Sequence, residues 1–154
     1  MAPGPIAILI PFVVGLAATV ATVAIHGAVF HAIVMTLRRD LKRGLLGART
    51  WVNSTFIFGT ILVALGSHLA EIVLWGFVLH LSGAVTSVGA AIYSSAGSYT
   101  TSGSDILLPP QWRLLGPFEA VDGMLMFGVS TAFIFAVVSR LIHARYDDAD
   151  TFVL

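Results

Sequence analysis

The chain has 154 residues, of which 57% are hydrophobic and 10% are charged, and its formal net charge at pH 7 is zero. Its mean hydropathy of +0.94 excludes an ordinary soluble domain and indicates an integral membrane protein. The chain has no cysteine, which excludes disulfide and thiolate chemistry, and no basic stripe of the kind that binds nucleic acid.

The first segment, residues 1–37, predicts an N-terminal transmembrane helix that begins near Pro5. It contains no charged residue, and about 20 apolar residues suffice to cross a bilayer core of about 30 Å. No basic residue precedes the apolar part, which is also longer than the roughly 7–15 residues of a signal-peptide core. We therefore expect a helix that stays in the membrane and packs around the outside of the other helices.

The second segment, residues 38–50, is predicted to be a basic cytoplasmic loop. It holds five of the eight lysine and arginine residues, and Arg140 and Arg145 follow the last apolar segment. The positive-inside rule therefore places this loop and the C-terminus in the cytoplasm and the N-terminus outside. The chain then crosses the membrane three times.

A second spanning helix is predicted over residues 51–80, followed by a short helix over 87–98 that cannot span a bilayer by itself. The region around this short helix, residues 83–110, has two interpretations. It is either a re-entrant segment or an extracellular loop, and the apolar character of residues 90–96 favours the re-entrant segment.

The third spanning helix is predicted over residues 114–144, after the interfacial pair Trp112-Arg113. Pro117 lies near its first turn, where proline is tolerated. The remaining tail, residues 146–154, is short and acidic, so we do not expect a ligand-binding domain for gating in this chain.

The segment between the short helix and the third helix reads Tyr99-Thr100-Thr101-Ser102-Gly103-Ser104-Asp105. Together with the order of helices, the apolar short helix, the pair Trp112-Arg113 and the two glycines of the third helix, it resembles the potassium channel superfamily. The likeness is to small bacterial two-transmembrane pore-loop channels that carry an extra N-terminal helix, and it covers about residues 51–143.

This resemblance implies an all-α, potassium-channel-like tetramer with three transmembrane helices, a re-entrant pore helix and a filter loop. Residues 51–145 would be the pore domain, with outer helix 51–80, pore helix 87–98 and inner helix 114–144. The implied ion filter consists of Thr100, Thr101, Ser102, Gly103, Ser104 and Asp105. Gly123 and Gly128 would be hinges for gating.

The implied function is passive transport of monovalent cations, not an enzymatic reaction, in a bacterial inner membrane. No cofactor and no metal other than permeant K⁺ or Na⁺ is expected, and the expected partners are the lipid bilayer and further copies of the chain.

The filter departs from the family pattern Thr-Val-Gly-Tyr-Gly-Asp, because residues 101–105 are one residue shorter and lack the tyrosine and the second glycine. Fewer carbonyl sites predict weaker discrimination of potassium from sodium. The alternative is a collapsed filter that does not conduct. Asp105 is expected to form a carboxylate ring at the outer mouth, to hydrogen-bond the end of the pore helix, or both.

Ionisable residues inside the predicted spans are expected to be functional or paired, because an unpaired charge there is costly. Glu119 and Asp122 share one helix face and are candidates for lining a cavity or for supporting the structure. His68 and Glu71, at i, i+3 spacing, are expected to brace the pore helix. They also leave open a membrane metal- or haem-binding protein, and a non-conducting scaffold on a channel fold is a further alternative.

Overall fold

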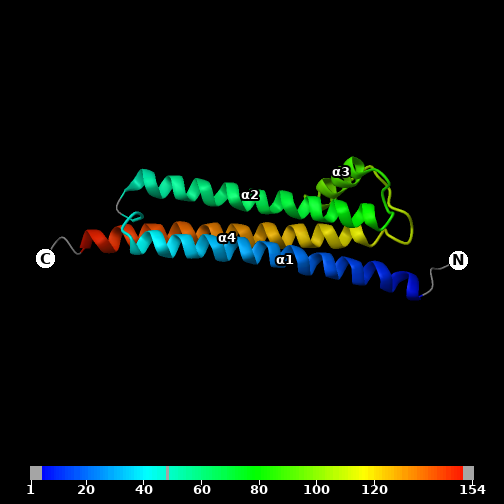
Figure 1. Ribbon diagram of the computed structural model, residues 1–154, viewed down its shortest axis with the longest axis horizontal. Helices are drawn as coiled ribbons and strands as arrows, with labels where there is room; N and C mark the ends of the chain where they lie inside the picture. Colours follow the sequence, from blue (N-terminus) through cyan, green and yellow to red (C-terminus); the bar gives the residue numbers. More distant parts are fainter. Residues whose placement is uncertain (1–4, 48, 151–154) are drawn as a thin grey trace. The chain divides into compact units, whose positions relative to one another are not determined.

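The computed structural model describes residues 5–47 and 49–150, with side chains described for 9–47 and 49–146. This part of the chain contains only helices, so the predicted all-α class is confirmed (Figure 1). In chain order the helices are α1 Pro5–Lys42, α2 Thr50–Leu81, α3 Val88–Tyr99 and α4 Leu115–Asp150.

Three of the helices are long and apolar enough to cross a membrane. The candidate spans are Leu9–Lys42, Thr50–Leu81 and Leu115–Tyr146, with hydropathies of 2.0, 1.9 and 2.0. A helix of 32 residues is about 48 Å long, which exceeds a hydrocarbon core of about 30 Å. Each helix can therefore span the bilayer and extend past it.

Two helices continue further than the sequence predicts. α1 runs to Lys42 instead of residue 37, and α4 runs to Asp150 instead of residue 144. Charged residues lower the hydropathy of a segment without breaking a helix, and α1 ends with Arg39 and Lys42 in its last turn, where basic residues are favourable. The predicted basic loop 38–50 is therefore wrong for residues 38–42, and the predicted tail is helical from 146 to 150.

The turn after α1 is made by glycine. Gly44 has φ +66°, and its N–H donates to the Leu41 carbonyl at 3.0 Å. A residue with positive φ just after the last helical turn is the common way in which a helix ends. The helix stops at this glycine rather than where the charges begin.

The chain divides into two compact units, and α1, α2 and α4 contribute residues to both. Unit 1 comprises residues up to Ile25 together with Ser67–Phe127, and unit 2 comprises His26–Gly66 together with residues from Gly128 onward. Unit 1 contains the whole of α3, and unit 2 contains the turn between α1 and α2.

The core of unit 1 is built around α3. Trp75 and Leu79 of α2, Tyr99 of α3 and Leu115 of α4 are fully buried in one apolar cluster. Ser87 caps α3, because its side chain accepts the Ala90 N–H at 3.5 Å. Figure 1 shows α3 beside the end of α2 that leads into the loop.

Glycine permits α3 to approach both of its neighbours closely. A Cβ atom added at Gly76 of α2 would lie 2.8 Å from the Ile92 side chain, and one added at Gly123 of α4 would lie 2.0 Å from the Tyr99 carbonyl oxygen. No real side chain fits at such distances. Gly123, a predicted gating hinge, therefore also has a packing role, whereas a Cβ at Gly128 meets no atom within 4 Å.

Unit 2 is held by a second apolar cluster. Leu37 of α1 packs with Val137 and Leu141 of α4, and the turn residue Leu46 joins them. Asn53 ties the turn to α2, because its Oδ1 accepts the Gly47 N–H at 2.9 Å. The cluster holds the turn and the C-terminal parts of α1 and α4 together, and the hydrogen bond holds the turn against the start of α2.

The two glycines of α4 provide a matched test of the α3 contact. We expect Gly123→Ala to destabilise the protein by about 1–3 kcal/mol, because the new methyl group overpacks the contact with α3. Gly128→Ala is the control and is expected to stabilise α4 by up to about 1 kcal/mol through helix propensity. Thermal unfolding in detergent measures both, and equal melting temperatures for the two variants would contradict the packing described here.

Candidate functional site

The six predicted filter residues form a single turn that reverses the chain after α3. The Thr100 N–H and hydroxyl both donate to the Ala96 carbonyl, at 3.1 and 2.7 Å, and so end the helix. The Gly103 N–H then donates to the Gly97 carbonyl at 3.0 Å. The loop therefore runs back along the helix that precedes it.

Hydroxyl groups stabilise the returning part of this loop. The Ser104 hydroxyl donates to Ser94 Oγ of α3 at 3.1 Å and accepts the Ile106 N–H at 3.1 Å. Thr101 and Gly103 have φ of +58° and +86°, and this left-handed conformation suits glycine at 103. The local geometry depends on these two residues and on the small side chains of α3.

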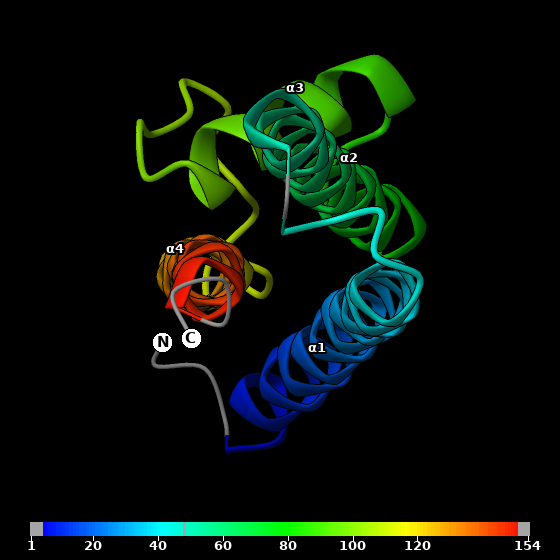
Figure 2. The same ribbon diagram turned by 90° about the vertical axis from the view of Figure 1, so that its left-hand side faces the viewer.

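The loop is exposed in the single chain. Thr100, Thr101, Ser102, Gly103 and Asp105 are exposed, and Ser104 is half-buried. Figure 2 shows the connection between α3 and α4, in yellow-green, projecting outward from these two helices. Polar side chains and irregular backbone are thus presented together on one side of unit 1.

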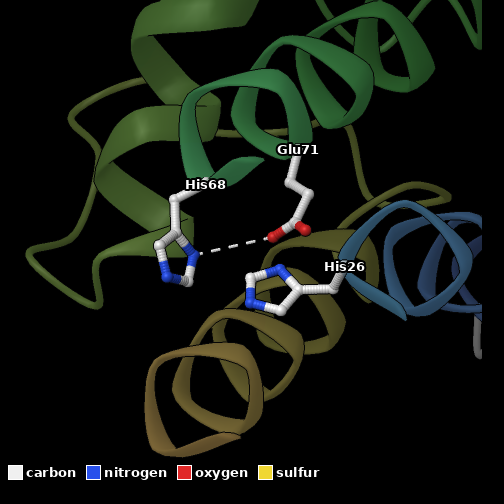
Figure 3. Close-up of side chains that lie close together, drawn as sticks. All are labelled: His26, His68 and Glu71. Atoms are coloured by element: carbon white, nitrogen blue, oxygen red, sulfur yellow. Dashed lines mark ion pairs between the residues drawn. The ribbon is translucent and has the colours of Figure 1, made fainter. Parts of the chain in front are cut away.

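The C-terminal end of α3 is anchored by a buried polar cluster on α2. The Tyr99 hydroxyl donates to the Glu71 carboxylate and lies 2.9 Å from His68 Nδ1. His68 Nδ1 and Glu71 Oε2 are 3.6 Å apart, and Figure 3 shows the two side chains pointing toward one another. The predicted pair therefore contacts the last residue of α3, although its role in function stays a prediction.

A second polar contact joins the middle of α3 to both neighbouring helices. The Ser95 hydroxyl lies 2.7 Å from the Ile72 carbonyl oxygen of α2 and also contacts the Glu119 carboxyl group of α4. Glu119 is fully buried, and its Oε2 has no hydrogen-bond partner within the described part of the chain. Glu119 therefore faces α3.

Asp122, one turn further along α4, contacts α1 and α2 instead. Its carboxylate accepts the Thr22 hydroxyl at 2.8 Å and the indole N–H of Trp75 at 2.8 Å. All three side chains are almost completely buried. Arg113, at the predicted interface, donates from its Nε to the Leu108 carbonyl at 3.4 Å.

These contacts lie well inside unit 1. Glu71 precedes the end of α2 by ten positions and Gly123 follows the start of α4 by eight, which correspond to about 15 Å and about 12 Å along the helices. Tyr99 touches both residues. The C-terminal end of α3 therefore lies beside interior turns of α2 and α4 and not beside the helix ends that flank it.

Sequence reasoning missed the side chains that pair with the buried acids. Trp75, Tyr99, Ser95 and Thr22 provide these partners, and none of them was singled out for that role. A signal existed, since a tryptophan or tyrosine inside an apolar helix usually needs a hydrogen-bond partner when it is buried. The identity of the partner follows only from the packing.

No protein-family model, curated protein or solved structure matches the chain.

The contribution of the Tyr99 hydroxyl can be isolated with a conservative substitution. We expect Tyr99→Phe to lower the free energy of unfolding by about 1–3 kcal/mol, because the buried groups of Glu71 and His68 lose a hydrogen-bond partner. Tyr93→Phe is the matched control, since Tyr93 lies on the same helix with 63% of its surface exposed. Unfolding of the solubilised protein by titration with a denaturing detergent measures both, and an unchanged midpoint for Tyr99→Phe would refute the assigned contact.

Proposed function

We propose that the chain is the subunit of a cation channel in which residues 100–105 form the ion pathway. The observation that carries this proposal is that α3 packs against both α2 and α4 and is followed by an exposed polar loop that turns back along the same helix. A helix that enters a membrane part-way and a loop that returns to the same side make a re-entrant segment.

Membrane physics supports the re-entrant interpretation. α3 has 12 residues and is about 18 Å long, too short to cross a core of about 30 Å. Irregular backbone at membrane depth occurs only where protein buries it or where it lines water. The loop 100–105 is exposed in one copy. If it lies within the membrane, its polar backbone groups therefore need either water or a further copy of the chain as hydrogen-bond partners.

The orientation of α3 favours cations near its C-terminal end. The helix macrodipole places partial negative charge at that end, close to Thr100. The hydroxyl groups and backbone carbonyls of the loop are the oxygen ligands that replace the hydration shell of a permeating cation. Asp105 adds a carboxylate at the end of the loop, and such groups raise the local cation concentration.

A single copy does not enclose a pore, so the proposal includes a ring of copies around an axis lined by the loop. Closed rotational symmetry is the rule for soluble oligomers. In such a ring the exposed loops of neighbouring copies would lie next to one another around the axis. Four copies follow from the resemblance to the potassium channel superfamily. In the orientation given by the positive-inside rule, the loop opens to the outer side and the C-terminus is cytoplasmic, in a bacterial inner membrane.

The proposed selectivity is for monovalent cations with weak preference for potassium over sodium. The loop is one residue shorter than the family filter and lacks its second glycine. Serine hydroxyls at 102 and 104 then contribute ligands where the family uses backbone carbonyls. Fewer fixed carbonyl sites strip less water from the ion, so the smaller and more strongly hydrated sodium ion is less effectively rejected.

The buried acids support this pathway without lining it. Glu71 and Glu119 contact Tyr99 and Ser95 of α3, and Asp122 joins α4 to α1 and α2. Removing the charge of an acid that lined the pathway would change conduction directly. Removing the charge of a supporting acid instead lowers the stability of the assembly.

Ion flux from liposomes tests the pathway. We expect purified protein to release both potassium and sodium along their gradients, and Gly103→Val to abolish this flux, because a β-branched residue does not tolerate φ of +86°. Gly83→Val is the matched control, since Gly83 also has positive φ, +72°, and open space around its Cβ, but lies before α3.

The outcomes separate the channel from its main rival. Loss of flux in Gly103→Val with flux retained in Gly83→Val supports the assigned pathway. Intact tetramers that carry no cation under any gradient would replace the channel with a non-conducting scaffold.

Asp105 gives a salt-dependent test of the outer mouth. We expect Asp105→Asn to lower cation flux about two- to fivefold at about 10 mM salt and to have little effect at about 1 M, where the Debye length falls from about 30 Å to about 3 Å. Asp40→Asn, at the end of α1, serves as the control and is expected to leave flux unchanged. A salt-independent loss would show that Asp105 acts on the structure of the loop instead of attracting ions.

A further inference from the structure

Unit 2 contains a pocket of about 460 Å³ that combines an apolar floor with a cationic rim. α1 contributes Val34, Leu37 and Leu41 to the floor and Arg38 and Lys42 to the rim, and Arg140 of α4 completes the lining. All six lining residues therefore come from two helices of the same unit.

Helix periodicity explains why these residues share a pocket. Val34, Arg38 and Lys42 follow one another at i, i+4 spacing on α1, so their side chains lie on one face. Leu37 and Leu41 lie beside them and pack against α4 in the apolar cluster of this unit. Arg140 lies next to Leu141 in sequence, so the same α1–α4 packing brings the third cation to the pocket.

The electrostatics of the pocket calls for an anion. None of its lining residues is acidic. Within the described residues, no hydrogen bond or ion pair involves the side chains of Arg38, Lys42 or Arg140. Three cations around one cavity repel each other, and an anion bound between them removes this repulsion. Phosphate is a suitable anion, because one arginine guanidinium can donate two parallel hydrogen bonds to two phosphate oxygens.

The place of the pocket along the helices identifies the source of that anion. Lys42 is the last residue of the apolar span Leu9–Lys42. The cationic rim is therefore at the end of a membrane-spanning helix, where phospholipid headgroups lie, and the floor of Val34, Leu37 and Leu41 extends toward the hydrocarbon. A soluble phosphate would use the rim and leave the apolar floor without a partner.

We propose that this pocket binds one anionic glycerophospholipid, with its phosphate between Arg38, Lys42 and Arg140 and an acyl chain along Val34 and Leu41. The proposal requires only the membrane-spanning helices and does not depend on ion conduction. The lipid would join α1 to α4 at the basic end of the helices.

Native mass spectrometry of the detergent-solubilised protein tests this proposal without any flux measurement. In a lipid titration, the first dioleoyl phosphatidylglycerol molecule is expected to bind with at least about tenfold higher affinity than dioleoyl phosphatidylcholine. The reason is that each basic residue near an anionic headgroup raises the binding affinity by about fivefold. Arg38→Gln, Lys42→Gln and Arg140→Gln are each expected to weaken phosphatidylglycerol binding by about fivefold.

Matched controls distinguish a built site from general surface attraction. Arg39→Gln and Arg43→Gln remove charges from the same end of the protein but from residues outside the pocket lining. We expect both to keep the wild-type affinity, and Arg38→Lys to retain more binding than Arg38→Gln. Circular dichroism of each variant checks that α1 and α4 remain helical, so a loss of lipid is not mistaken for unfolding.

Three results would overturn the proposal. The first is equal affinity for phosphatidylglycerol and phosphatidylcholine, and the second is equal loss in the lining and control variants, which would mean general attraction to an anionic surface. The third is displacement of the lipid by millimolar inorganic phosphate, which would assign the pocket to a soluble anion. None of these results bears on the channel proposal, which liposome flux tests separately.

Discussion

Unit 1 depends on the close packing of α3 against α2 and α4 in a buried apolar cluster. Two glycines, Gly76 and Gly123, permit the approach, and buried polar groups make it specific. Tyr99 and Ser95 of α3 are satisfied by acidic side chains of α2 and α4. A polar group buried in an apolar environment costs several kcal/mol without a partner, at about 2–7 kcal/mol in transfer measurements, so these pairings restrict α3 to one position.

The same packing determines where the loop 100–105 goes. α3 ends where Thr100 caps it, and the Gly103–Gly97 hydrogen bond turns the chain back. The loop consequently presents hydroxyls, carbonyls and one carboxylate on a single exposed side. The buried acids and the exposed loop thus depend on each other. The acids hold α3 in place, and the position of α3 leaves the loop exposed.

The ionisable side chains near α3 and those near the C-terminal ends of α1 and α4 have different roles. Near α3 the acidic side chains are buried and hydrogen-bonded to neighbouring helices, so they contribute to the structure. At the ends of α1 and α4 the cations are exposed around an apolar floor, so their charge remains available to a ligand. Both follow from one condition, because charged groups near apolar helices require either an internal partner or an external one.

The sequence by itself determined three segments that are long and apolar enough to span a membrane, the short helix between the last two and the polar loop that follows it. It could do so because hydropathy and segment length depend only on local composition. It misplaced the end of α1, since charge at Arg38 lowers hydropathy without breaking a helix that continues to the turn at Gly44. Only the tertiary structure decided which side chains meet. Glu119 faces Ser95 while Asp122, on the same helix face by spacing, meets Thr22 and Trp75, because partners far apart in the chain are chosen by helix packing and not by periodicity.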